Sequence, residues 1–211
     1  SSGALALGEL EQASASALVR DASGASQSFG RAGKLFADAQ QTVADLGAGT
    51  SLVLSALPLT QKHYRTNKNL AVAGEAIAQA GERIADGFVA LERSLDASPT
   101  SRLTLLATYV EAALPNLERA EGLIASIDEE AVPAEQRATF TDLKSTLTAL
   151  SASLREFLEF NDMAQTILGA DGTKRYLAVF QNNTELRPTG GFMGSFAELT
   201  VRNGEIVAMH V

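Results

Sequence analysis

The stretch RYLAVFQNNTELRPTGGFMGSFAELTVRNGEIVAMHV, residues 175–211, decides the fold, because the chain changes here from helical periodicity to short strand-like runs. It opens with an apolar and aromatic run, Arg175–Phe180, and closes with FAELTV and EIVAMHV on either side of Asn203-Gly204. Asn-Gly between two apolar runs is the strongest short-range signal for a β-hairpin. We therefore predict strands in this stretch and a two-residue turn at Asn203-Gly204.

A polar, glycine-rich segment, Gln181–Phe196, separates the first two of these runs. We expect it to form a loop at the mouth of the sheet, where binding groups are commonly mounted on a rigid scaffold. The candidate ligand-binding residues are Asn182, Asn183, Glu185, Arg187 and Thr189.

Among these candidates, Arg187 has the side chain best suited to an anion, because a guanidinium presents a planar fork to a carboxylate or a phosphate. Glu185 lies two residues earlier and either orients Arg187 or neutralises it, and the sequence leaves both alternatives open. Asparagines beside a strand end more often close turns than touch ligands. The segment is a candidate ligand site to which no reaction is assigned.

RYLAVFQNNTELRPTGGFMGSFAELTVRNGEI also resembles the signature of the bacterial domain-of-unknown-function family 4012, which reads strand, Gln-Asn-Asn, Glu-Leu-Arg, Thr-Gly-Gly-Phe, strand. In that family the motif opens a larger extracytoplasmic α/β domain, behind a membrane anchor and a helical region. The resemblance implies an extracytoplasmic protein whose membrane anchor lies outside this chain. It also implies that residues 171–211 are the start of a β-containing domain truncated at Val211. It implies no activity.

A fainter similarity connects Arg187 and the hairpin to the LytR-CpsA-Psr enzymes, which transfer glycan polymers from polyprenyl pyrophosphate. These enzymes also place an arginine just before a strand hairpin. The aspartates expected of that family near this point are absent here.

Upstream of residue 171, apolar residues alternate at spacings of three and four in four successive stripes, the pattern of a coiled-coil seam. The stripes cover residues 18–46, 70–95, 103–127 and 140–168. They predict a mainly α fold, with an elongated antiparallel four-helix bundle over residues 4–170. We expect Leu147 and Leu154, both in the last stripe, to be fully buried.

Connections between the stripes set the expected topology. Ser98-Pro99 and residues 128–133 make short connections, so the last three helices should be antiparallel neighbours. The first connection, Gly47–Asn69, is longer, and we expect it to contain a short helix that ends at Pro58.

Three features of the stripes bear on packing. Gly74, Gly81 and Gly87 around the second stripe should let neighbouring backbones approach closely. Pro115 lies off its stripe, which predicts a kink without a full break. Asn161 lies within a seam, where a buried amide often fixes register or oligomeric state; the alternative is that it reaches solvent near the helix end.

Composition excludes several classes of function. The chain has no cysteine, which excludes disulfides, zinc fingers and thiol nucleophiles. The two histidines, His63 and His210, lie far apart and have no partner at ligand spacing, so we expect no metal site, no serine triad and no cofactor. A net charge of −8 argues against nucleic acid as a partner.

Three interpretations of function stay open from the sequence. The first is a non-catalytic, extracytoplasmic cell-envelope fragment in which a helical rod positions a C-terminal α/β binding domain. The second is a polyprenyl-linked glycan transferase in which Arg187 grips a pyrophosphate. The third is a sensor that binds a small molecule in a polar cavity between helices. The expected partners are a cell-envelope glycan or a lipid-linked phosphate, and a homo-oligomer is compatible with the seams.

Overall fold

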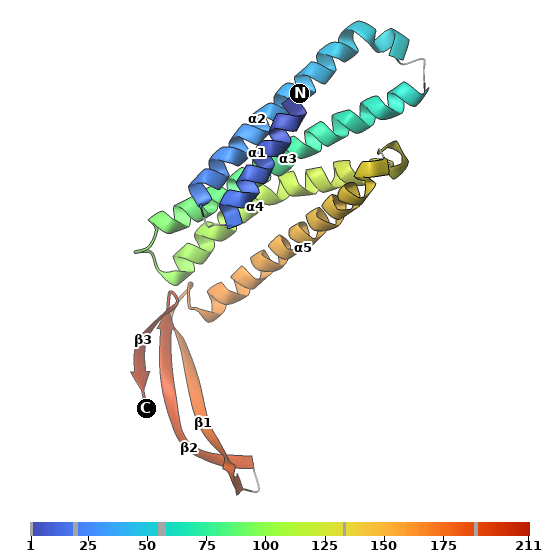
Figure 1. Ribbon diagram of the computed structural model, residues 1–211. Helices are drawn as coiled ribbons and strands as arrows, with labels where there is room; N and C mark the ends of the chain where they lie inside the picture. The colour runs from blue at the N-terminus through green and yellow to red at the C-terminus, as the bar shows by residue number, and fades with distance from the viewer. Residues whose placement is uncertain (1, 19–20, 55–57, 133, 188–189) are drawn as a thin grey trace.

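The structure, a computed structural model, describes residues 2–18, 21–54, 58–132, 134–187 and 190–211 (Figure 1). The helical periodicity of the first part of the chain appears in these ranges as five α-helices and two short 3-10 turns. The α-helices are α1 (Ser2–Leu18), α2 (Ala22–Leu54), α3 (Pro58–Arg93), α4 (Pro99–Ala125) and α5 (Arg137–Ile167), and the 3-10 turns are Glu129–Ala131 and Ala134–Gln136. The mainly α fold predicted from the stripes is confirmed, and α1 adds a fifth helix ahead of the four that the stripes predict.

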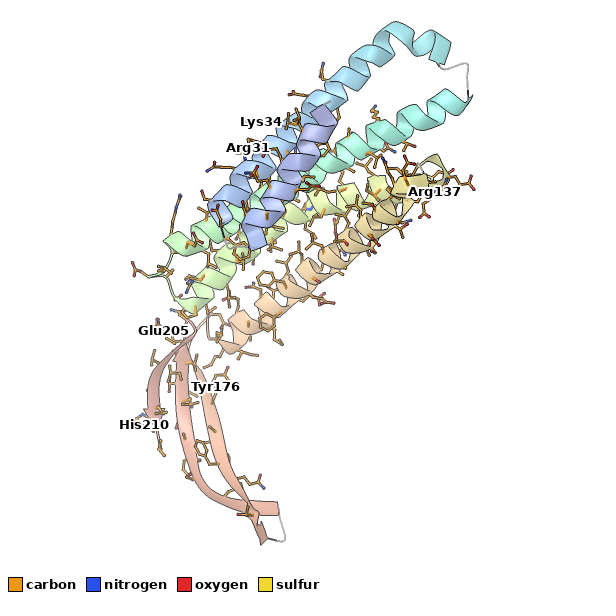
Figure 2. All side chains as sticks on the ribbon, in the orientation of Figure 1. Arg31, Lys34, Arg137, Tyr176, Glu205 and His210 are labelled. Atoms are coloured by element: carbon orange, nitrogen blue, oxygen red, sulfur yellow. The ribbon has the colours of Figure 1, made fainter. Side chains whose placement is uncertain are left out.

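Each helix packs on the next one in the sequence, so the helices form an open, elongated array (Figure 1). In the described part of the chain, α5 packs extensively on α4 and on no other α-helix. α1 lies against α2, where Arg31 pairs with Glu9 at 2.9 Å (Figure 2). α3, α4 and α5 run antiparallel to their neighbours, as the short connections predict.

Small residues fill much of the core. Alanines of α3 and α4 pack with a few large side chains, and the buried cluster comprises Ala73, Ala76, Ala80, Ala113, Leu117, Ala120, Ile124, Ile127, Val132, Phe140 and Leu147. The glycines predicted to allow a close approach of backbones are instead packed against aromatic side chains. A Cβ atom added at Gly74 would lie 2.6 Å from the Phe36 ring, and one at Gly81 would lie 2.5 Å from the Phe29 ring.

The first predicted connection is wrong. In place of a long loop over Gly47–Asn69, α2 continues to Leu54 and α3 begins at Pro58. Pro58 thus starts a helix and does not end one, because a proline at the first helical position lacks only an N–H that would have no partner there. α4 continues through Pro115, so the expected absence of a full break is confirmed, and the kink stays a prediction.

The burial predicted for the last stripe is only half right. Leu147 is buried at 3% exposure, but Leu154 is only partly buried and Leu150 is 39% exposed. The physical reason is the open array, because over the described ranges α5 packs extensively on α4 and on no second α-helix. Asn161 is buried and does not reach solvent.

The C-terminal stretch forms an antiparallel sheet in the order β1-β2-β3, with β1 (Lys174–Arg187), β2 (Gly190–Arg202) and β3 (Glu205–His210). The predicted Asn203-Gly204 turn is confirmed: Arg202 pairs with Glu205, and both turn residues have positive φ, 53° and 82°. The sheet extends from the end of the array where α4 begins and α5 ends (Figure 1).

Candidate functional site

The polar motif lies at the far end of the β1–β2 hairpin, away from the helices (Figure 1). The expected loop is much shorter than predicted, because β1 runs to Arg187 and β2 begins at Gly190. Asn182, Asn183, Glu185 and Arg187 therefore belong to a strand. Thr189 lies outside the described residues.

Two irregularities in strand pairing bracket this motif. Phe180 pairs with Ser195 but Gln181 pairs with Met193, which leaves Gly194 as an extra residue in β2. Asn182 then pairs with Phe192, and the next pair is Leu186 with Gly191, so residues 183–185 form an insertion in β1. Bulges change the direction of side chains and are frequent next to functional sites.

The structure thus gathers four of the predicted site residues on the distorted end of one strand. The side chains of Asn182, Asn183, Glu185 and Arg187 lie outside what the structure describes, so the Glu185–Arg187 pair stays a prediction. The insertion of residues 183–185 in β1 was not predicted. The bulge in β2 lies at Gly194, and a glycine within a strand is the kind of residue expected to permit one.

A second cluster of contacts lies at the other end of the sheet, where the Asn203-Gly204 turn meets the helices. The main-chain nitrogen of Gly204 donates to the Leu168 carbonyl at 2.8 Å, and that of Asn203 donates to the Gly169 carbonyl at 3.1 Å. The Thr100 nitrogen, in the first turn of α4, donates to the Asn203 carbonyl at 3.5 Å. Helix ends leave such N–H and C=O groups without partners inside the helix. One turn of the sheet therefore caps two helices.

Steric fit at this junction is tight. A Cβ added at Gly204 would lie 2.6 Å from the Cβ of Pro99, at a φ of +82°. One added at Gly169 would lie 2.5 Å from the Gly172 carbonyl oxygen and 3.0 Å from that of Val201, at a φ of +72°. Glycine is required at both positions by the positive φ and by the space.

Side chains reinforce the junction. Tyr176, which lies on β1 close to the lower ends of the helices (Figure 2), donates its hydroxyl hydrogen to the Ile167 carbonyl. Lys174 pairs with Asp171 at 3.2 Å in the segment that joins α5 to β1. These contacts lie within a few residues of the end of α5, so they hold β1 against that end. The Asn203-Gly204 turn holds β2 and β3 against the same end of the array.

Between α4 and α5, Gln165 provides a polar link near the same end. Its Nε2 lies 2.9 Å from both the Thr100 carbonyl oxygen and Thr104 Oγ1, and 3.3 Å from Asn161 Oδ1. Asn161 is thus buried with a hydrogen-bonding neighbour, which fits a role in fixing the register of α5 on α4.

Neither metal chemistry nor a membrane span is indicated by the described residues. In the described ranges, no group of three His, Cys, Asp or Glu side chains is placed to hold a metal ion. No helix in these ranges is both long enough and apolar enough to cross a bilayer. His210 lies exposed on β3 (Figure 2), and the side chain of His63 is outside the description.

Comparison with known proteins bears on the sheet. Residues 171–210 match the family described as "Protein of unknown function (DUF4012)". The resemblance expected from the motif is therefore confirmed for this segment, which contains all three strands and the turn that caps α4 and α5. The similarity to LytR-CpsA-Psr enzymes is not shown by this match. No curated protein and no solved structure matches the chain.

Proposed function

We propose that the helical array is a rigid, non-catalytic mount that holds the C-terminal sheet, and the binding domain it begins, in a fixed orientation in the cell envelope. The observation that carries the proposal is the capping of α4 and α5 by the Asn203-Gly204 turn. A flexible tether would need only the short segment from Gly169 to Thr173. A mount needs contacts on more than one element, and the turn supplies them.

The direction of the hairpin supports the same role. β1 and β2 carry the polar motif to the end of the hairpin that is farthest from the helices (Figure 1). A fixed junction at one end of two long strands would determine where Arg187 and its neighbours are presented. The extracytoplasmic, membrane-anchored setting is proposed from the family resemblance of residues 171–210.

Rigidity can be tested by measuring a distance between the array and the sheet. The chain has no cysteine, so spin labels can be attached at two introduced cysteines, for example at the exposed Ala149 of α5 and Ser195 of β2. We expect one narrow distance distribution from pulsed electron paramagnetic resonance. Gly204→Ala should broaden it, because the new Cβ meets Pro99.

Gly172→Ala is the matched control, since Gly172 also has a positive φ but has no atom within 4 Å of an added Cβ. A broad distance distribution in the doubly labelled chain that keeps both Gly204 and Gly172 would refute the proposal of a rigid mount. Equal broadening by both variants would place the rigidity in the linker and not in the capped turn. The envelope setting is tested separately, by protease accessibility of the full-length protein in intact cells and spheroplasts; protection in both would contradict it.

A further inference from the structure

A long apolar cavity lies in the helical array, far from the sheet motif. Its volume is about 560 Å³, and α2, α3, α4 and α5 all contribute to its walls. The lining residues are Ala22, Ala25, Phe29, Ile77, Gly81, Ile84, Ala85, Phe88, Glu92, Leu117 and Leu150. The cavity is open to solvent on one side, where Phe88 and Leu150 are partly exposed. Its volume lies within the range of ligand pockets, about 300–1,000 Å³.

The cavity follows from two features of the chain. Ala25 of α2 and Ala85 of α3 line the cavity with small side chains, whereas the space beside Gly81 is filled by the Phe29 ring. Among the described residues, α5 packs mainly along α4, and Leu150 is the α5 residue that lines the cavity. Leu150 and Phe88 are 39% and 47% exposed, and these two partly exposed apolar residues are part of the wall.

The shape of the cavity suits an extended chain. Its walls follow α3 from Ile77 to Glu92, a span of about 22 Å at ~1.5 Å per residue. One hydrocarbon leaflet of a bilayer is roughly 15 Å thick, half of the ~30 Å core. The lining residues therefore span a length that matches a single hydrocarbon chain, and apart from Glu92 the side chains named above are apolar or glycine.

Glu92 gives the cavity a polar end. It is the one charged residue among the lining residues, it is exposed, and within the described part of the chain it has no hydrogen bond or ion pair. The neighbouring Arg93 is also exposed, but it is not among the residues that line the cavity. A phosphate or carboxylate head group would be repelled here, and a cationic one attracted.

We propose that this cavity binds the hydrocarbon chain of a single-chain amphiphile whose positively charged head group lies at Glu92. The proposal goes beyond the mounting role and does not depend on it. The cavity is in the array and the mount is at the junction, so either can fail while the other holds.

Binding of alkylamines from octyl to decyl and longer, kept below their critical micelle concentrations, tests the hydrocarbon part. Affinity measured by calorimetry should rise about fourfold per methylene and then level off once the chain fills the cavity. A plateau is expected only for a cavity of finite length. Absence of binding, or a rise that continues through octadecyl, would overturn the proposal.

Leu150→Gln and Leu143→Gln form a matched pair, because both leucines are on α5, are 39% and 36% exposed, and only Leu150 lines the cavity. Leu150→Gln should weaken binding about tenfold, from lost apolar contact. Leu143→Gln should leave the affinity unchanged. Equal effects of the two changes would contradict a site in this cavity.

The head-group part is tested with an alkylamine, an alkanol and an alkanoate of equal chain length. The amine should bind roughly two- to fivefold more tightly than the alkanol, as expected for a partly exposed ion pair, and the alkanoate most weakly. Glu92→Gln should remove the preference for the amine, whereas Glu159→Gln, an exposed change on α5 away from the cavity, should retain it. Tightest binding of the alkanoate would overturn the head-group assignment.

The competing possibility is that α5 closes onto α2 in solution, which would remove the cavity. Spin labels at the exposed Gln27 of α2 and Ser153 of α5 report that distance. We expect the distance to change little when the alkylamine binds, because the cavity is already open. The proposal would be overturned if the label distance showed α5 lying against α2 without ligand and if adding the alkylamine did not lengthen that distance.

Discussion

The main-chain nitrogen of Gly204 donates to the carbonyl oxygen of Leu168 at 2.8 Å, although the two residues belong to different parts of the fold. Leu168 follows the last residue of α5, and Gly204 is the second residue of the turn between β2 and β3. The same turn accepts a hydrogen bond from Thr100 at the start of α4. Residues that are distant in sequence thus meet at one junction, and its contribution to the free energy of unfolding can be tested.

Gly204→Ala should lower the free energy of unfolding by roughly 1–3 kcal/mol, because a non-glycine residue at positive φ is strained. The contact that the new Cβ would make with Pro99 adds to this cost. Thermal or urea unfolding measures the change. A silent substitution would show that the turn does not dock as described.

Gly122→Ala supplies the control for that measurement. Gly122 is exposed within α4, and an added Cβ there meets nothing within 4 Å. Alanine is favoured over glycine in a helix by about 0.5–1 kcal/mol. We therefore expect a small gain in stability, opposite in sign to the effect at Gly204.

Leu147→Ala should destabilise the array by roughly 2–5 kcal/mol, as large-to-small changes in cores do. Leu147 is 3% exposed and belongs to the main buried cluster. Leu143→Ala, one turn earlier on the same stripe but 36% exposed, should cost much less. Chemical unfolding of the two variants decides the matter, and equal losses would mean that α5 packs differently.

Gln165→Ala should cost about 1–2 kcal/mol, because the Thr100 carbonyl and the buried Asn161 amide would lose their hydrogen-bonding neighbour. Thr166→Ala is a suitable comparison, since Thr166 is exposed and, among the described residues, its hydroxyl donates only to the Asp162 carbonyl of the same helix. Hydrogen exchange at the start of α4 should accelerate in the Gln165 variant alone. Unchanged exchange would show that this link does not hold α5 on α4.

Local chemistry made the turn and the helices predictable. Asn203-Gly204 requires positive φ at both positions, which the dipeptide itself favours. Heptad spacing identified the apolar face of α5, but spacing cannot show which helix covers that face. Leu154 was therefore predicted to be more buried than it is, and the apolar cavity beside Leu150 was not predicted.

Other features escaped prediction because the same residue fits two local structures. Pro58 is compatible with either the end or the first position of a helix, and the structure shows the second. The Gln181–Phe196 segment has loop-like composition, yet antiparallel pairing extends through most of it with two bulges. The junction depends on pairing between α4, α5 and the turn, which no local pattern encodes.

Arg187 is the site residue for which function and structure can be separated most directly. It lies at the end of β1, opposite Gly190 and remote from the helical array. Arg187→Ala in the full-length protein should therefore leave the melting temperature of the helical part unchanged. It should weaken binding of a phosphate-bearing envelope glycan or lipid, because the guanidinium fork would be lost.

Arg187→Lys distinguishes geometry from charge at this position. Lysine keeps the positive charge but has no planar pair of donors, so it should fail to restore binding if Arg187 holds an anion bidentately. If Arg187→Lys binds as tightly as the unsubstituted protein, then Arg187 contributes to binding through its positive charge alone. Lost stability with intact binding in Arg187→Ala would instead make Arg187 structural, most simply as the partner of Glu185.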